Sequence, residues 1–175
     1  MNVRQLNIPE DHPKILKQKI GVIIGNLGTP DATDYWSMRR YLKEFLSDRR
    51  VIDYSPWVWK PILNLILLRR PFSSGEAYKE IWMKKEDMSP LRYFTIMQTK
   101  KLLDRIGSKD VIVDYAMRYG NPSIKSKMLD LQERGCENII ILPLYPQYAA
   151  ATTATIQDKC EYHCLTSSCC KPSLS

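Results

Sequence analysis

The sequence predicts an α/β fold, with a parallel sheet flanked by helices. Three short runs rich in β-branched residues, at 20–26, 111–117 and 138–142, are typical of buried strands. Segments with helical periodicity or capping signals lie between them, and strands that alternate with helices favour a parallel sheet with right-handed crossovers. Ligands of such sheets bind at the carboxyl ends of the strands, so we expect the functional site there.

The first half of the chain begins with the strand at 20–26 and a helix at 33–46. In this helix apolar residues recur close to every 3.6 positions. The next segment, 51–72, is rich in aromatic residues but contains three prolines, so we expect it to be irregular. The tetrapeptide Ser-Ser-Gly-Glu at 73–76 matches a capping box and predicts a short helix that ends at Trp82.

Capping signals place the remaining helices. Ser and Thr are typical N-caps, proline is favoured at the first helical position, and glycine commonly ends a helix. The predicted helices run from Ser89-Pro90 to Gly107, from Asn121-Pro122 to Gly135, and from Thr152 or Thr153 onwards. We therefore divide the chain into a polar leader at 1–18, an α/β domain at 19–159 and a cysteine-rich irregular tail at 160–175.

Composition limits the class of protein. A chain of 175 residues with 44% hydrophobic content fits one domain with a real core. The net charge of +7 suggests an anionic partner: nucleic acid, lipid headgroups or an acidic small molecule. The leader lacks the features of a secretory signal, and the most hydrophobic stretch, Ile62 to Leu68, is far shorter than the roughly 20 residues of a membrane span. We expect a cytoplasmic protein, with peripheral attachment to a membrane as an option.

The cysteines gather at the end of the chain. Cys136 stands alone, while the others are Cys160, Cys164, Cys169 and Cys170. Without a secretory signal a disulfide framework is not expected. The spacing C-x3-C-x4-C-C matches no standard zinc pattern, so an irregular tail is favoured over a metal site.

Polar and aromatic residues follow each predicted strand. They are the turn at 26–30, then Arg118 and Tyr119, and finally Tyr145, Gln147 and Tyr148. Gly28 can adopt positive φ in the first turn, although this turn lacks the spacing of a dinucleotide or nucleoside-triphosphate site. Because the carboxyl ends of parallel strands share one edge, these residues predict a binding crevice.

Two further features allow both a structural and a functional interpretation. Arg69 and Arg70 are a solvated pair beside a hydrophobic patch, or a fork for carboxylates, which guanidinium groups bind in bidentate fashion. The aromatic segment that begins at Tyr54 is too apolar for an ordinary loop. It is either core beneath a lid or a surface that meets a ligand or a bilayer.

Taken together, six motifs in this order resemble the ferrochelatase family. The motifs are N-L-G-T-P at 26–30, F-L-S-D-R-R at 45–50, R-R-P at 69–71, S-P at 89–90, A-M-R-Y-G-N-P at 116–122 and L-Y-P-Q-Y-x-x-x-T-T at 144–153. The resemblance implies a lyase that inserts Fe²⁺ into protoporphyrin IX, its two substrates, in the last step of haem biosynthesis. It covers residues 19–159 and corresponds to one chelatase-type, Rossmann-like half of the family's fold, with the second half missing.

The resemblance also implies roles for individual residues. The turn at 26–30 resembles the floor of the porphyrin cleft, and 57–68 resembles a hydrophobic lip that grips the macrocycle and rests on the membrane. Arg70 is suited to a porphyrin propionate, and Arg118 with Tyr119 matches the pair on the metal side. Tyr78 and Ser89 match porphyrin contacts, or are a core residue and an N-cap. The predicted substrate-binding residues are Asn26, Leu27, Gly28, Arg70, Tyr78, Ser89, Arg118, Tyr119, Tyr145, Gln147 and Tyr148.

Departures from the family pattern are equally informative. The family's metal-handling histidine and glutamate belong to the second half, and neither His12 nor His163 has a matching motif. No catalytic residue is identifiable, and Tyr119 is the nearest candidate. Ala150 stands where cluster-bearing members have a cysteine, so we expect no iron–sulfur cluster, no other cofactor and no resident metal.

Three functions therefore remain open. The chain is a truncated ferrochelatase, inactive in metal insertion as it stands, or a non-catalytic tetrapyrrole-binding module, or a membrane-surface module. None of them involves nucleic acid. The first two require porphyrin binding, whereas the third predicts binding to lipid vesicles regardless of porphyrin.

Overall fold

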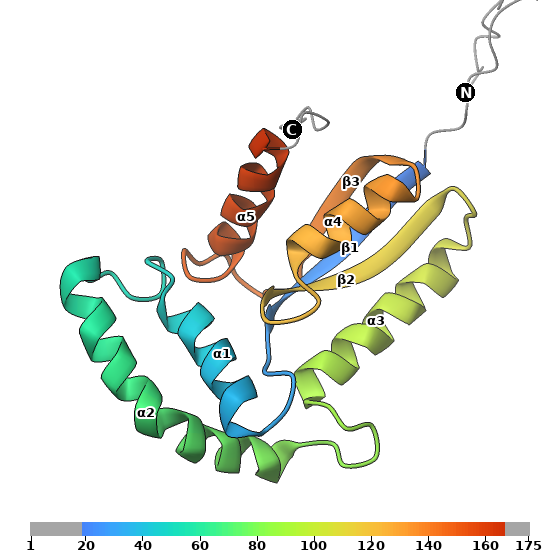
Figure 1. Ribbon diagram of the computed structural model, residues 1–175. Helices are drawn as coiled ribbons and strands as arrows, with labels where there is room; N and C mark the ends of the chain where they lie inside the picture. The colour runs from blue at the N-terminus through green and yellow to red at the C-terminus, as the bar shows by residue number, and fades with distance from the viewer. Residues whose placement is uncertain (1–18, 167–175) are drawn as a thin grey trace, which may run out of the picture.

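The computed structural model describes residues 19–166, with side chains through residue 161. The leader at 1–18 and the end of the predicted tail, 167–175, lie outside the described residues. Within the described range, three strands and five helices follow one another in the order β1-α1-α2-α3-β2-α4-β3-α5 (Figure 1).

The three strands form one parallel sheet, as the sequence predicts. They are β1 (Lys19–Gly28), β2 (Val111–Tyr119) and β3 (Cys136–Pro143), and β1 lies in the middle of the order β2-β1-β3. Gly28 at the end of β1 pairs with Tyr119 at the end of β2. Each strand is longer than predicted, so Arg118 and Tyr119 are the last two residues of β2 and do not follow it.

Helices cover both faces of the sheet. On one face lie α4 (Ile124–Glu133) and α5 (Thr153–Thr166), where the glycines of β1 leave room for Leu131 and Ile156. These contacts continue into a buried cluster that includes Ile23 and Ala116. On the other side of the sheet α3 (Pro90–Ile106) runs along β2, ending at Gly107 with φ 60° as the glycine signal predicts (Figure 1).

The region between the first two strands differs from the prediction. The helix α1 (Tyr35–Leu46) forms as expected, capped by Asp34, but the segment predicted to be irregular belongs to one long helix, α2 (Pro56–Ile81). This helix contains two internal prolines and shows no new start at the capping box of 73–76. Figure 1 shows α2 curving around α1.

Packing explains why α2 persists through its prolines. Each proline removes one backbone hydrogen bond and disfavours a straight helix. The face of α2 that meets α1 is nevertheless buried at regular helical intervals, by Leu63, Leu67, Pro71 and Gly75. Burial of this face offsets the lost hydrogen bonds, because most helix stability in proteins comes from tertiary packing.

The helix α5 also extends beyond the prediction. It continues to Thr166, so the irregular segment expected from Cys160 does not begin there. Its first turn lies where Thr152 and Thr153 predict a cap, and Thr155 and Ile156 are fully buried. The start of α5 thereby packs against β1, where the Ile156 side chain meets Gly25.

Candidate functional site

The ends of β1 and β2 meet in very close contact. A Cβ atom on Gly28 would lie 1.9 Å from the backbone oxygen of Tyr119, and Gly28 has φ 113°. Only glycine allows both the conformation and the approach. The motif N-L-G-T-P thus brings the end of β1 directly against the backbone of Tyr119.

Arg118 and Tyr119 converge on one carboxylate, that of Asp48. The Arg118 guanidinium forms an ion pair with Asp48 Oδ2, and the Tyr119 hydroxyl donates to the same oxygen at 2.9 Å. The guanidinium also lies 4.3 Å from the centre of the Tyr119 ring. We call these three residues the Asp48 junction. It is buried: 6% of the Arg118 side chain and 13% of the Asp48 side chain are exposed.

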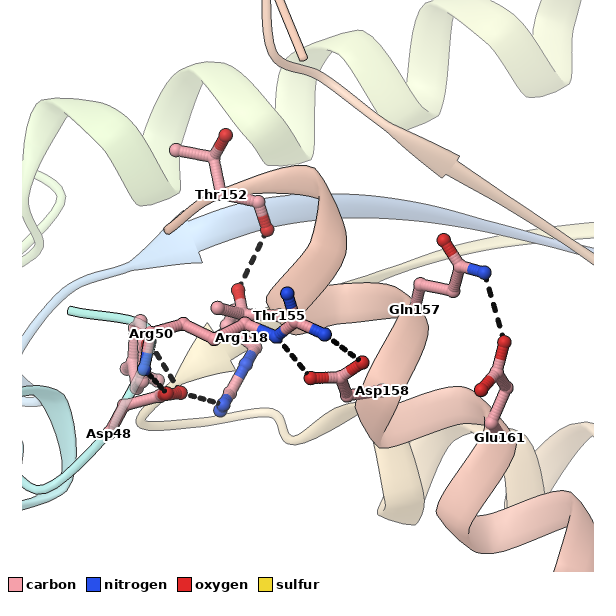
Figure 2. A network of polar contacts seen from close by, with 9 residues as sticks. Asp48, Arg50, Arg118, Thr152, Thr155, Gln157, Asp158 and Glu161 are labelled. Carbon is pink, nitrogen blue, oxygen red and sulfur yellow. Dashed lines mark hydrogen bonds and ion pairs between the residues drawn. The ribbon is translucent and has the colours of Figure 1, made fainter. Parts of the chain in front are cut away.

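A second arginine–aspartate pair lies beside the first (Figure 2). Arg50 binds Asp158 of α5 through two nitrogens, and the backbone N–H of Arg50 donates to Asp48 Oδ1 at 2.9 Å. The Arg50 and Asp158 side chains are 42% and 49% exposed. The turn after α1 is therefore joined to β2 by a buried pair and to α5 by an exposed one.

Three more tyrosines surround this edge of the sheet. Tyr41 of α1 donates to the Gly28 carbonyl at 3.3 Å. Burial raises the pKa of Tyr41, and the Tyr78 phenol raises it further. Burial also raises the pKa of Tyr145 to about 12, against a smaller lowering by Arg118. The Tyr145 hydroxyl has no hydrogen-bond partner among the described residues. Predicted site residues from β1, α2, β2 and the segment after β3 thus lie around one region.

Two other predicted residues contribute to the packing of α3. Asn26 donates through Nδ2 to Thr95 at 3.1 Å, while its Oδ1 accepts from the backbone N–H of Leu27 at 3.0 Å. Ser89 is buried and accepts from the backbone N–H of Arg92 at 3.3 Å. Ser89 is therefore the N-cap of α3, as one of its two interpretations predicts. Asn26 lies on the side of the sheet that α3 covers.

Three further predicted residues are exposed to solvent. Arg70 is exposed on α2, and its carbonyl accepts a hydrogen bond from Ser73. Gln147 and Tyr148 are exposed in the segment between β3 and α5. The Arg70 guanidinium is thus open to a ligand, whereas that of Arg118 is held by Asp48.

The predicted lip is the outward-facing side of α2. Its exposed apolar side chains recur at helical spacing and form what we call the outer stripe: Trp57, Val58, Ile62, Leu65, Leu68 and Phe72. Trp57 is 90% exposed and Leu65 is 71% exposed. Leu63 and Leu67, within the same segment, point inward and are buried. A hollow of about 330 Å³ at the start of α2 is lined by Trp57, Lys60 and two prolines.

The described residues form neither a metal-binding cluster nor a membrane-spanning helix. No group of three or more His, Cys, Asp or Glu side chains there is arranged to hold a metal ion. No helix in the same part of the chain is long and apolar enough to span a membrane. Cys136 is a buried free thiol whose pKa is raised by burial, and Cys160 is half-buried.

Sequence reasoning missed the residue at the centre of the site. Asp48 lies in the motif F-L-S-D-R-R but received no role, because its partners are 70 and 71 residues away. One signal was available. An arginine predicted at the end of a buried strand requires a carboxylate, since buried charges are paired. Tyr41 is one of the periodic residues of the helix predicted at 33–46, and nothing in the sequence alone marks it further.

Comparison with known proteins gives a consistent family match. The family model described as Ferrochelatase matches residues 19–174, which continues past the predicted limit at residue 159. A ferrochelatase of Rhodobacter capsulatus is 56% identical over 156 residues, 86% of this chain and 44% of that protein. One of Rhizobium etli is 53% identical over 168 residues, 95% and 48% respectively. One of Agrobacterium fabrum is 51% identical over 158 residues, 89% and 46%.

The extent of these matches limits what they transfer. This chain spans about half the length of the curated relatives that it matches. The matched half contains the strand ends, the Asp48 junction and the outer stripe. The fold, the six motifs and the family match agree, and the chain belongs to the ferrochelatase family.

Proposed function

We propose that this chain forms one wall of a porphyrin site and, as part of a ferrochelatase, serves the insertion of Fe²⁺ into protoporphyrin IX. The observation that carries the proposal is the arrangement at the carboxyl edge of the sheet. Gly28, Tyr119 and Tyr145, which are far apart in the sequence, lie around one region there. Family membership supplies the substrate class.

The residues divide the work of binding. The outer stripe offers apolar area for the flat macrocycle or for the acyl chains of a membrane surface, and exposed Arg70 lies near its end. A guanidinium is a good partner for a propionate, because it forms charge-assisted and often bidentate hydrogen bonds. Tyr119 is the candidate nearest to the metal side of the macrocycle. Its hydroxyl donates to Asp48, so any further hydrogen bond at the phenol oxygen is one that it accepts.

We propose further that the chain by itself does not insert iron at an enzymatic rate. Insertion requires two pyrrole protons to be removed, and general-base assistance typically contributes about 10²–10⁴-fold. Ferrous iron is delivered by imidazole or carboxylate ligands. The described residues hold no cluster of such groups, and Asp48 is already paired with Arg118. Binding of a tetrapyrrole without metal insertion is therefore the second candidate function.

Two further proposals concern cofactor content and cellular location. We propose that no iron–sulfur cluster is bound, since Ala150 replaces the cysteine found in cluster-bearing relatives. We also propose a cytoplasmic protein whose outer stripe contacts a membrane peripherally. Lys60, Arg69 and Arg70 belong to the same helix and are exposed, which suits anionic lipid headgroups.

The test of the porphyrin site compares two neighbouring arginines. Arg70→Ala should weaken protoporphyrin binding about tenfold or more, because a desolvated charge-assisted pair contributes roughly 1.5–3 kcal/mol. Arg69→Ala is the matched control, an equally exposed arginine one position away, and should change the affinity little. Titration by quenching of tryptophan fluorescence measures both. Equal affinities for the two variants would remove Arg70 from the site.

A metal-insertion assay tests the proposed lack of activity. The purified 175-residue chain should incorporate zinc or iron into a soluble porphyrin only at the background rate. Robust turnover that is lost on Tyr119→Phe would contradict this and would identify Tyr119 as catalytic.

A further inference from the structure

One carboxylate holds three donors at the carboxyl end of β2. Asp48 Oδ2 accepts from the Arg118 guanidinium and from the Tyr119 hydroxyl, and Asp48 Oδ1 accepts from the backbone N–H of Arg50. The acceptor belongs to the turn after α1, while two of its donors end a strand about 70 residues later. Asp48 therefore links the first helical region of the domain to the edge of the sheet.

Burial makes these contacts strongly directional. Tyr119 is fully buried and Arg118 almost so. In such an environment an unpaired guanidinium or phenol is costly, so the geometry of Asp48 decides where both groups point. Tyr119 also packs edge-on against Phe45 of α1, with ring centres 5.1 Å apart. This contact restricts rotation of the Tyr119 ring.

The direction of the Tyr119 hydrogen bond has a chemical consequence. A phenol has one hydrogen to donate and lone pairs to accept with. Because the hydrogen is given to Asp48, the buried Tyr119 oxygen has none left to donate and can only accept further hydrogen bonds. The same carboxylate balances the charge of Arg118, so the pair presents no net positive charge at this point.

We propose that Asp48 is a positioning residue, which fixes Tyr119 as a hydrogen-bond acceptor and neutralises Arg118 at the porphyrin site. The role of these two residues at the site rests on the proposed function, whereas the positioning by Asp48 does not. Asp48 itself acts through its neighbours and touches no reacting atom.

The groups that act on Tyr119 make the positioning measurable. Burial raises the pKa of Tyr119, nearby Arg118 lowers it, the hydrogen bond and charge of Asp48 raise it, and the Thr155 hydroxyl of α5 lowers it. From α1, the Tyr41 phenol packs nearby and Glu44 accepts from the adjacent Gly120 N–H. Removing the Asp48 charge leaves the Arg118 cation uncompensated, so the pKa of Tyr119 should fall.

The experiment follows Tyr119 directly by NMR. The full 175-residue chain is labelled with ¹³Cζ-tyrosine, the Tyr119 resonance is assigned with Tyr119→Phe, and each variant is titrated with base. In Asp48→Asn the Tyr119 resonance should shift at neutral pH. The pKa of the Tyr119 phenol should fall by about 1 to 3 pH units relative to the wild type. Asp158→Asn is the matched control: it breaks the neighbouring arginine–aspartate pair and should leave Tyr119 unchanged.

A double variant covers the case in which Asp48→Asn does not fold. Asp48→Asn combined with Arg118→Gln removes both buried charges, which is less costly than removing one. Compared with Arg118→Gln alone, the double variant should still shift the Tyr119 resonance, because the phenol loses its carboxylate acceptor. A Tyr119 resonance that is the same with and without Asp48 in either background would overturn the positioning role.

Addition of protoporphyrin separates this inference from the proposed function. Porphyrin should shift the wild-type Tyr119 resonance if Tyr119 faces the site. An effect of Asp48→Asn without any response to porphyrin would support the positioning of Tyr119 and contradict its place at a porphyrin site. A response to porphyrin without an effect of Asp48→Asn would support the place of Tyr119 at a porphyrin site and contradict its positioning by Asp48.

Discussion

The Asp48 junction and the outer stripe of α2 both lie in family motifs, but they satisfy their side chains in opposite ways. The junction is polar and buried, and its charges find partners inside the chain. The stripe is apolar and largely exposed, although its last member, Phe72, packs against the Tyr35 ring of α1. The geometry of the junction is therefore fixed by contacts within this chain. The stripe, in contrast, has the character of a surface that binds a ligand, a membrane or another protein.

The largest expected effect concerns the two arginine–aspartate pairs. Asp48→Ala leaves the Arg118 guanidinium buried without its carboxylate and should lower the free energy of unfolding by about 3–5 kcal/mol. Asp158→Ala breaks a pair whose side chains are nearly half exposed, so its cost should stay within about 1 kcal/mol. Urea unfolding followed by circular dichroism measures both. Similar losses would mean that burial does not distinguish the two pairs.

The next effect contrasts the two faces of α2. Leu67 is fully buried against α1, and Leu67→Ala should cost about 2–5 kcal/mol through lost burial and the cavity left behind. Leu65, two positions away on the outer stripe, should change stability little when replaced by alanine, since it is 71% exposed. Thermal unfolding of the two variants gives the comparison. A large loss for Leu65→Ala would show that the stripe is packed in solution.

These two regions also show what the sequence could predict. The strands were predictable because β-branched runs end in glycine or proline, and the parallel order follows from their alternation with helices. The site edge followed from the rule for carboxyl ends, which correctly brought Gly28 and Tyr119 together. Such features are predictable because the residues that determine them lie within about ten positions of one another in the sequence.

What the sequence could not predict depends on contacts between distant residues. The helix α2 contradicts the local rule for proline, and only the burial of Leu63 and Leu67 against α1 explains it. Asp48 meets Arg118 only after the chain has folded, so the residues next to Asp48 in the sequence do not indicate its role. The exposure of Arg70 and the burial of Arg118 likewise depend on which face of an element meets its neighbours.

The smallest expected effect is the loss of membrane affinity from the outer stripe. Leu65→Ser should weaken binding to anionic vesicles by at most about tenfold, because burying one leucine side chain contributes roughly 1.5–3 kcal/mol and a peripheral helix buries it only in part. Leu129→Ser on α4 is the matched control, an exposed leucine outside the stripe, and should leave binding unchanged. Co-sedimentation with vesicles measures both, and raising the salt concentration should weaken binding of all three proteins, since exposed lysines and arginines of α2 flank the stripe. Equal losses for the two leucines would point to general hydrophobic adsorption, and the stripe would then be left as a surface for the porphyrin or for a protein partner.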